Sequence, residues 1–250
     1  MSGMDKVKKE INNIVIENDI DAIIINGENS ANGKGLRLKE YEILDNLGAD
    51  VITMGNHIYY RKEMALEYKK LPKLVLPANV KNLEKNDYVI FEKCGKKIGV
   101  TNILGTVNMF EDTSNLSDSF AKAREIVGLL KDEGCQYIFV DFHAETTAEK
   151  IAMGHCLKDD VTCVFGTHTH VQTADETIID GKMAYITDVG MTGPKDSVLG
   201  LKKEVALKRF VDRTYAKYEC SQNEAILNGI IVTTDDEKCI ANNIERISIK

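Results

Sequence analysis

Hydrophobic positions in the first half of the chain alternate between helical and strand-like spacing. Val7, Ile11, Ile14 and Val15 recur at helical intervals, so the spacing predicts an amphipathic helix over residues 4–18. Three further elements follow from the same pattern: a buried strand over Asp21–Asn26, a helix over Leu38–Leu47 that ends at Gly48, and a short buried strand over Val51–Met54. Residues 61–69 are also predicted to be helical.

The second half mixes hairpins with further helices and strands. Strands are predicted over Tyr88–Phe91 and Ile98–Leu104 around a turn at Cys94–Lys97, and over Tyr137–Phe142, Val161–Phe165 and Ala184–Thr187. Helices are predicted from Phe120 to Leu130 with a stop at Gly134, over Thr147–Met153 and over residues 199–210. Thr106–Ser117 is polar and predicts an irregular loop. Ala225–Thr233 and Cys239–Ile249 predict a terminal hairpin around Asp235–Glu237.

This order of elements predicts an α/β fold. Two stacked mixed sheets with helices outside would bury the apolar face of every element. Ligands in such folds gather at the carboxyl ends of parallel strands. No repeat or Gly/Ser-rich linker interrupts the chain, so we expect a single domain over residues 1–250.

Composition narrows the classes of function. The 250 residues are 43% hydrophobic and carry a net charge of −7. Proteins that bind long nucleic acids usually have a positive balance, so we expect no such partner. A small phosphate ester remains compatible with an acidic protein if metal ions supply the positive charge. The longest apolar run, Ala22–Ile25, is too short to span a membrane.

The chain's start and its cysteines indicate a cytoplasmic location. Met1–Lys6 contains no apolar core of a signal peptide. The six cysteines form no C-x-x-C pair. In a reducing compartment their default state is the free thiol, mostly as packing residues.

Five motifs follow apolar strands and consist of side chains that can bind metals. They are Asn26-Gly27-Glu28-Asn29, Gly55-Asn56-His57, Asp141-Phe142-His143-Ala144-Glu145, Gly166-Thr167-His168-Thr169-His170 and, more weakly, the segment from Asp188 to Pro194. Four of the five histidines lie in these motifs. Imidazole and carboxylate are common ligands of first-row transition metals.

Each motif alone has an ordinary structural explanation. Asn26-Gly27 is typical of a turn, a strand-end histidine such as His143 usually only donates a hydrogen bond, and Asp188 reads better as a strand cap than as a ligand. Several such strand ends together are hard to obtain by chance. Glu28 has two oxygens and could bridge cations roughly 3.5–4 Å apart, as in two-metal hydrolases.

The sequence resembles the calcineurin-like metallophosphoesterases at Gly55-Asn56-His57 and at Gly166-Thr167-His168-Thr169-His170. In the second motif, Thr167 separates the glycine from the first histidine. The strings INGENSANGKGL, GADVITMGNH, FVDFHAE, FGTHTHVQTAD and AYITDVGMTGP narrow the match to the bacterial YmdB-type family, over nearly the whole chain. That family is described as 2′,3′-cyclic-nucleotide 2′-phosphodiesterases.

The resemblance implies a four-layer α/β/β/α sandwich and two metal ions, iron or manganese. One metal would bind Glu28, Asn56, His143 and His168, and the other Glu28, Asn29 and His170. A hydroxide between the metals would attack phosphorus in line. His57 would be the general acid that protonates the leaving oxygen.

Two departures from the family pattern accompany this resemblance. Family members begin with a strand that ends in Gly-Asp and supplies an Asp to the second metal, whereas this sequence starts at Met1-Ser2-Gly3. We therefore expect the sheet to lack a central strand and the second metal to lack one carboxylate, and we favour a shortened reading of the gene over a functional short form. Tyr59-Tyr60 also replaces the Trp-Asp that often follows the Gly-Asn-His motif, which bears on substrate fit.

Three functions stay open at this point. The first is a dinuclear phosphodiesterase acting on cyclic nucleotides or short nucleotide esters. The second is a degenerate relative that binds metal or nucleotide and acts as a regulatory or scaffold protein. The third is an enzyme that keeps the site but acts on a phosphomonoester or nucleotide. The loop Thr106–Ser117 and the turn Gly190–Pro194 are candidate substrate contacts. We also expect a homo-oligomer, on the general frequency of such assemblies.

Overall fold

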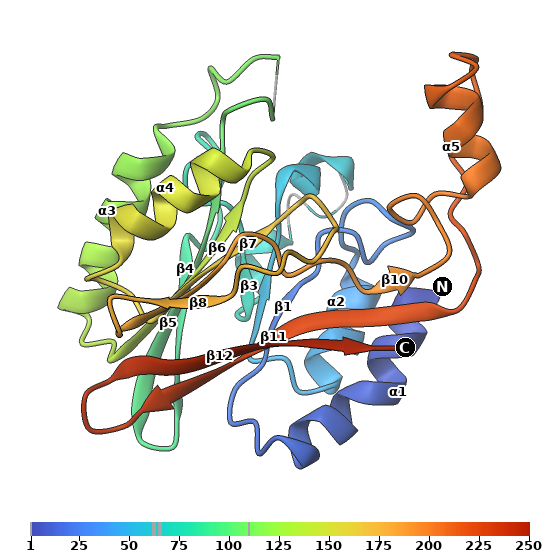
Figure 1. Ribbon diagram of the computed structural model, residues 1–250. Helices are drawn as coiled ribbons and strands as arrows, with labels where there is room; N and C mark the ends of the chain where they lie inside the picture. The colour runs from blue at the N-terminus through green and yellow to red at the C-terminus, as the bar shows by residue number, and fades with distance from the viewer. Residues whose placement is uncertain (1, 62–63, 65–66, 110) are drawn as a thin grey trace.

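Helices and strands follow one another in the computed structural model much as the hydrophobic spacing predicts (Figure 1). The structure describes residues 2–61, 64, 67–109 and 111–250. The helical elements are α1 (Ser2–Glu17), α2 (Leu38–Asn46), η1 (Asn56–Tyr60), η3 (Tyr68–Lys70), α3 (Ser119–Asp132), α4 (Thr147–Leu157) and α5 (Lys203–Phe210). The strands are β1 (Ile24–Asn26), β2 (Val51–Thr53), β3 (Leu74–Val75), β4 (Tyr88–Lys93), β5 (Lys96–Leu104), β6 (Tyr137–His143), β7 (Cys163–Thr167), β8 (Thr177–Ile179), β9 (Met183–Ile186), β10 (Gly193–Pro194), β11 (Ala225–Asp235) and β12 (Ile240–Ile249).

The largest sheet has six strands in the order β4-β5-β6-β7-β9-β8. Its central strands β5, β6, β7 and β9 run parallel, and the outer strands β4 and β8 are antiparallel to their neighbours. The parallel register places His143 at the end of β6 directly beside Thr167 at the end of β7. Two of the predicted metal-binding motifs therefore leave the sheet at the same edge.

The second layer of strands consists of two smaller sheets. One has the parallel order β1-β2-β3, and the other has the antiparallel order β10-β11-β12. Among the described residues, no strand joins β1 to β10 or β11 by hydrogen bonds, so these strands form two separate sheets.

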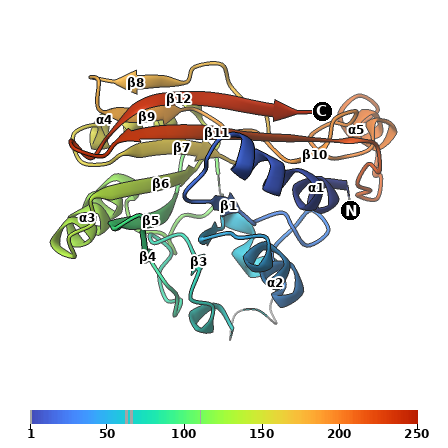
Figure 2. The same cartoon turned by 90° about the horizontal axis from the view of Figure 1, so that it is seen from below.

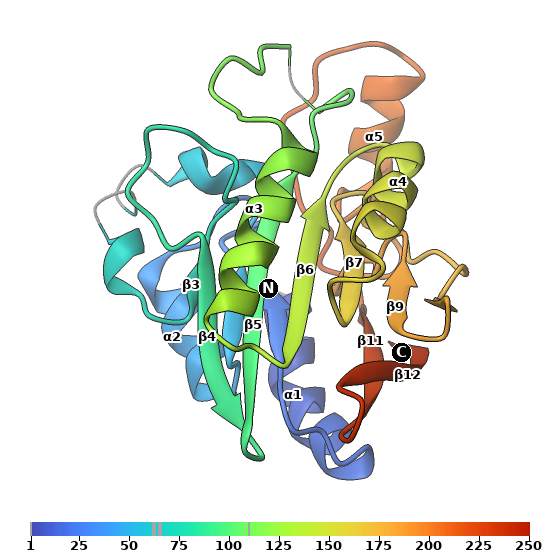
Figure 3. The ribbon, with the colours of Figure 1, turned by 90° about the vertical axis from the view of Figure 1, so that its left-hand side faces the viewer.

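The layers stack in the order helices, sheet, sheets, helices. Helices α3 and α4 cover the outer face of the six-stranded sheet (Figure 3), where Ala123, Leu130 and Met153 pack on Val140 and Phe142. Helices α1 and α2 lie outside the smaller sheets (Figure 2). The core between the strand layers contains Val51, Val75, Val100 and Tyr137, and farther along Phe165, Ile186 and Ile244. The predicted four-layer α/β/β/α sandwich is thus confirmed.

Local backbone rules explain where several elements begin and end. The Asp118 carboxylate accepts a hydrogen bond from Ala121 N and caps α3. The turn between β4 and β5 is tighter than the predicted four residues. Only Cys94 and Gly95 lie outside the strands, both with positive φ (49° and 71°), the conformation of a type I′ hairpin turn.

Three expectations about elements were wrong or incomplete. The helix predicted over 199–210 begins only at Lys203, because Leu199 and Gly200 have φ of 51° and 91°, which no right-handed helix contains. Strands β3, β8 and β10 were not predicted, since two or three residues show no periodicity. For the helix predicted over 61–69, the structure shows the 3₁₀ turn Tyr68–Lys70, and residues 62, 63, 65 and 66 lie outside the described residues.

Within the described part of the chain, none of the helices is both long and apolar enough to cross a bilayer. The expectation of one domain over residues 1–250 stays a prediction.

Candidate metal centre

The seven residues singled out from the sequence meet at one edge of the two strand layers. Glu28 and Asn29 follow β1, Asn56 and His57 begin η1 after β2, His143 ends β6, and His168 and His170 follow β7. Their side chains form two groups that share Glu28. We call Glu28, Asn56, His143 and His168 the buried half, and Glu28, Asn29, His57 and His170 the outer half.

In the buried half, three polar atoms crowd one ring nitrogen. His143 Nε2 lies 2.9 Å from Asn56 Oδ1, 2.9 Å from Glu28 Oε2 and 3.0 Å from His168 Nδ1. A ring nitrogen carries either one proton or one lone pair, so it can satisfy only one of these neighbours. Glu28 and His143 are each 1% exposed, which leaves water little access.

This crowding fits a cation better than a hydrogen-bond network. Ligand atoms of Glu28, His143 and His168 all lie within 4.8 Å of one another. Two imidazoles, a carboxylate and an amide oxygen form a donor set that suits iron, manganese or zinc. The residues present therefore fit the metal that the family resemblance implies at this position.

In the outer half, the side-chain amide of Asn29 links His57 to His170. Glu28 Oε1 accepts a hydrogen bond of 2.8 Å from His57 N. The ring nitrogen His57 Nδ1 lies 2.9 Å from Asn29 Oδ1, and Asn29 Nδ2 lies 3.0 Å from His170 Nε2. The two oxygens of Glu28 thus face different halves, Oε2 toward His143 and Oε1 toward His57.

The charges of the buried half are coupled. Burial favours a neutral Glu28, but the charges of His143 and His57 and the hydrogen bonds from both residues outweigh it and lower the pKa of Glu28 to about 2. Burial opposes a charge on His143 as well, yet the Glu28 carboxylate raises the pKa of His143 above its ordinary value. A carboxylate that stays ionised while buried is ready to bind a cation.

The other histidines favour the neutral form. Burial, followed by the charge of His143, lowers the pKa of His168 to about 4. Burial also lowers the pKa values of His57 and His170, although the Glu28 charge opposes it in both. Neutral imidazoles offer lone pairs, which metal binding requires.

The segment that carries His168 and His170 has a strained backbone. Their φ angles are 101° and 66°, in a region that costs a non-glycine residue free energy. Asp188 holds the segment in place, since its Oδ2 accepts bonds from Thr169 N (3.0 Å) and Thr169 Oγ1 (2.7 Å). Lys150 Nζ pairs with the same oxygen at 2.7 Å, and both side chains are 1% exposed. Asp188 therefore supports the backbone, as the sequence interpretation preferred.

Gly55 lets the motifs approach one another. A Cβ atom at this position would lie 2.4 Å from His143 Nε2 and 2.7 Å from the Glu28 carboxyl carbon. Only glycine therefore fits before Asn56 and His57 while His143 and Glu28 keep their positions.

The site lies on a chain that matches the family model described as "YmdB-like protein" over residues 1–247. The chain belongs to the YmdB-like family. A relative from Bacillus subtilis (strain 168) named 2′,3′-cyclic-nucleotide 2′-phosphodiesterase is 40% identical over 248 residues, which cover 99% of this chain and 92% of the relative. A putative phosphatase/phosphodiesterase from Mycoplasma pneumoniae is 39% identical and covers 94% of this chain and 84% of its own length.

Solved structures agree with this assignment. The crystal structure of a novel phosphatase from Mycoplasma pneumoniae superimposes with a TM-score of 0.91 at 35% identity, covering 99% of this chain and 89% of that one. These YmdB-like relatives are named as phosphodiesterases or phosphatases, and the family places this chain among the phosphoric ester hydrolases. The degenerate binding protein considered above is not favoured.

Sequence reasoning named Asp141 and Glu145 in the third motif but gave neither a role in the YmdB-like site. Asp141 is fully buried and accepts hydrogen bonds from Asn26 Nδ2, Thr53 Oγ1 and Thr167 Oγ1. The available signal was its position two residues before His143, which puts both side chains on one face of β6. Glu145 Oε2 lies 3.1 Å from His168 Nε2 at the mouth of the site.

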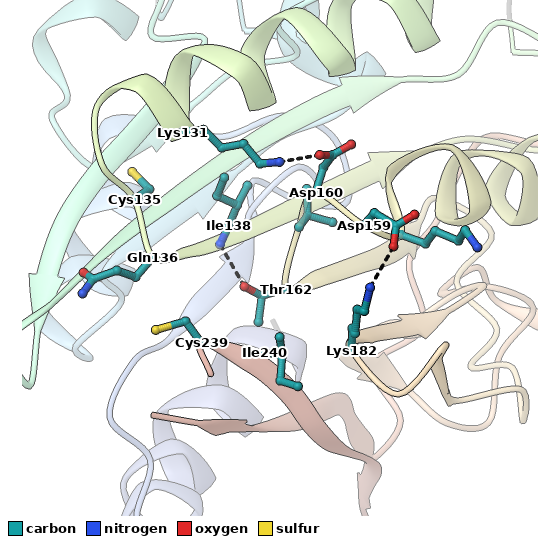
Figure 4. A pocket seen from close by; sticks show the side chains of 12 residues that line it. Lys131, Cys135, Gln136, Ile138, Asp159, Asp160, Thr162, Lys182, Cys239 and Ile240 are labelled. Carbon is teal, nitrogen blue, oxygen red and sulfur yellow. Dashed lines mark hydrogen bonds and ion pairs between the residues drawn. The ribbon is translucent and has the colours of Figure 1, made fainter. Parts of the chain in front are cut away.

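A hollow of about 140 Å³ lies away from these residues (Figure 4). It is lined at the amino ends of β6 and β7 by Ile138 and Thr162, whereas the candidate metal ligands His143 and His168 lie at the carboxyl ends of these strands. The charges that line it are already paired, Lys131 with Asp160, Lys182 with Asp159, and Lys158 with Asp180 outside the lining. The hollow therefore adds nothing to the hydrolase centre.

Proposed function

We propose that this chain is a dinuclear-metal phosphodiesterase that hydrolyses 2′,3′-cyclic nucleotides. The observation that carries the proposal is the position of Glu28, whose two oxygens face the buried half and the outer half separately. One cation would bind Glu28, Asn56, His143 and His168, and a second would bind Glu28, Asn29 and His170. Iron or manganese suits both donor sets. The name of the Bacillus subtilis relative supports the substrate.

The cations would supply the positive charge that stabilises the charge developing on the phosphoryl oxygens, and they would activate water. The chain's contribution is to hold the donor atoms in place before the substrate binds. Glu28 and His143 do so while almost completely buried, where charge interactions are stronger than in water.

His57 is positioned to act as the general acid. Its Nδ1 donates to Asn29 Oδ1, which leaves Nε2 free to carry the proton that is transferred. Water adds to phosphorus, the bond from phosphorus to O2′ breaks, and the departing O2′ takes its proton from His57. Burial lowers the pKa of His57, so the protonated ring gives up this proton readily. The product is the 3′-phosphate.

The rest of the substrate would contact the rim around His57. Tyr59 and Tyr60 follow His57 and are each 54% exposed. Asn115, from the loop Thr106–Ser117, donates a 3.0 Å hydrogen bond to Tyr59 Oη. This loop and the turn Gly190–Pro194 remain our candidates for binding the nucleoside. We further propose that the enzyme acts in the cytoplasm as a homo-oligomer, and its six free cysteines support a reducing compartment.

The deciding experiment measures metal content and hydrolysis on one sample. Elemental analysis of the protein purified with Mn²⁺ should give about two metals per chain, in keeping with the two-metal arrangement. The same sample should convert adenosine 2′,3′-cyclic phosphate to adenosine 3′-phosphate, identified by chromatography against the 2′ isomer. A sample with two metals that leaves the cyclic nucleotide intact and cleaves only phosphomonoesters would refute the proposed substrate.

A further inference from the structure

A chain of hydrogen bonds lies behind His143, on the side of the ring away from Glu28. His143 Nδ1 lies 2.8 Å from Thr167 Oγ1, and Thr167 Oγ1 lies 2.6 Å from Asp141 Oδ1. The in-register pairing of β6 with β7 brings these side chains together. All three are at most 5% exposed, so water does not replace any of these partners.

The donor and acceptor of each hydrogen bond in this series follow from counting protons. Asp141 receives bonds at both oxygens, from Thr167 at Oδ1 and from Thr53 (2.5 Å) and Asn26 (2.9 Å) at Oδ2. A hydroxyl has a single hydrogen, and that of Thr167 points at Asp141. The Thr167 oxygen is therefore left to accept from His143, which places a ring proton on Nδ1.

We infer that Thr167, anchored by Asp141, is a positioning residue that fixes the tautomer of His143. With the proton on Nδ1, the lone pair of Nε2 points at the position between Glu28, Asn56 and His168. Without the Thr167 hydroxyl, the nearby Glu28 carboxylate would draw the proton to Nε2 and block that lone pair. The inference rests on the proposed function in one respect only, namely that His143 is a metal ligand.

The position of Thr167 in the sequence explains how a hydroxyl comes to lie behind His143. Thr167 is the residue that separates Gly166 from His168, where the calcineurin-like signature has glycine followed directly by histidine. Because Thr167 ends β7 and pairs with His143, the additional residue puts a hydroxyl at the back of the ring. Partners of this kind commonly change metal affinity by 10–100-fold when they are removed.

The test compares substitutions that keep or remove this hydroxyl. Thr167→Val removes the hydroxyl and keeps a side chain of similar size. Thr167→Ala removes the hydroxyl and shortens the side chain, and Thr167→Ser keeps the hydroxyl. Thr187→Val is the matched control. Thr187 is also buried beside a strand end, and its hydroxyl donates to the Asp175 carboxylate. The hydrogen bonds observed for the Thr187 hydroxyl, to Tyr185 and Asp175, involve none of the site histidines. Circular dichroism and thermal unfolding establish which variants fold.

The first measurement is the tautomer in the full-length, metal-free protein. Long-range ¹H–¹⁵N correlation spectra, recorded at a pH where the rings are neutral, distinguish Nδ1–H from Nε2–H, and His143→Gln assigns the signal. Wild type, Thr167→Ser and Thr187→Val should show Nδ1–H, and the folded Val or Ala variant should show Nε2–H. A wild-type ring with Nε2–H would overturn the inference.

The second measurement is Mn²⁺ affinity by calorimetry. Thr167→Val and Thr167→Ala should bind roughly 10–100-fold more weakly than wild type, and Thr167→Ser and Thr187→Val should bind like wild type. Equal affinity in all variants would refute the positioning role. Wild type that binds no Mn²⁺ would refute the proposed metal site, whereas the tautomer would still decide the hydrogen-bond chain. Normal Mn²⁺ binding without nucleotide hydrolysis would refute only the proposed substrate.

Discussion

The two halves of the centre use the same residue types but hold them very differently. In the buried half, His143 is fixed from behind by Thr167 and Asp141 and from the front by Glu28, and it lies on a regular strand. In the outer half, His57 and His170 are linked through the single amide of Asn29. The difference suits a division of labour. A rigid half can bind one cation tightly, and a half with fewer restraints can move a proton and release product.

Glu28→Gln should have the largest effect, because it alters both halves at once. Losing several kcal/mol of metal-based stabilisation corresponds to roughly a 10⁴-fold loss in kcat/KM. Elemental analysis and kinetics on the same preparation measure it. Glu145→Gln is the control, since among the described residues Glu145 pairs with His168 and not with His143 or His57, and its substitution should cost far less. Similar losses in both variants would contradict the bridging role of Glu28.

His168→Ala should affect metal binding in the buried half and leave the outer half intact. It removes a donor from the buried half only, so metal content should fall from about two toward one per chain, with activity reduced about a thousandfold as for the loss of one key electrostatic contact. His170→Ala should remove the other metal instead. Full metal occupancy in His168→Ala would show that the ligand assignment is wrong.

His57→Ala tests the proton-transfer role of the outer half. Turnover should fall about a hundredfold or more, as is typical when a general acid is removed, while metal content stays at the wild-type value. His155→Ala, which changes the exposed histidine of α4, is the control and should be neutral. Unchanged turnover in His57→Ala would exclude this residue as the acid.

The pH dependence of unfolding should report on His168. Burial and the His143 charge lower the pKa of His168 from 6.5 to about 4. Below pH 6.5 the unfolded chain therefore binds a proton that the folded chain accepts only near pH 4, so the free energy of unfolding falls as the pH drops through this window. The difference between the two pKa values corresponds to a loss of up to about 3 kcal/mol in the free energy of unfolding. Urea titrations of metal-free wild type and His168→Gln should show a shallower decline in the variant; parallel curves would contradict the shift.

Tyr59→Phe should have the smallest effect. It removes the hydrogen bond from Asn115 at the exposed rim, which contributes about 1 kcal/mol or less. We expect KM for the cyclic nucleotide to rise less than about fivefold, with kcat and metal content unchanged. A large fall in kcat would mean that the rim takes part in the chemistry.

Much of this candidate centre could be predicted from sequence because its candidate ligands lie at strand ends. Apolar runs before Glu28, Asn56, His143 and His168 predicted strands, and parallel strands bring their carboxyl ends to one edge. The four-layer fold followed from the same alternation together with the family resemblance. The Asp188 cap was also foreseen from its place after β9.

What could not be predicted depends on contacts between distant strands. Nothing in the string around Asp141 shows that Asn26, Thr53 and Thr167 converge on it, since each comes from a different strand. The positive φ angles of His168 and His170 were equally hidden, because no glycine marks them. The start of α5 was misjudged since Leu199 is an ordinary helix former that tertiary structure holds in a left-handed conformation.

The hydrogen bond between Asn26 and Asp141 joins residues 115 positions apart, and the bond between Asn29 and His170 spans 141. Contacts of such separation form late in folding, after most loop closure is complete. During synthesis, the centre cannot exist until both strand layers have left the ribosome and met. Uptake of the proposed metals would therefore require the finished chain, and an incomplete polypeptide in the cell would compete poorly for scarce transition metals.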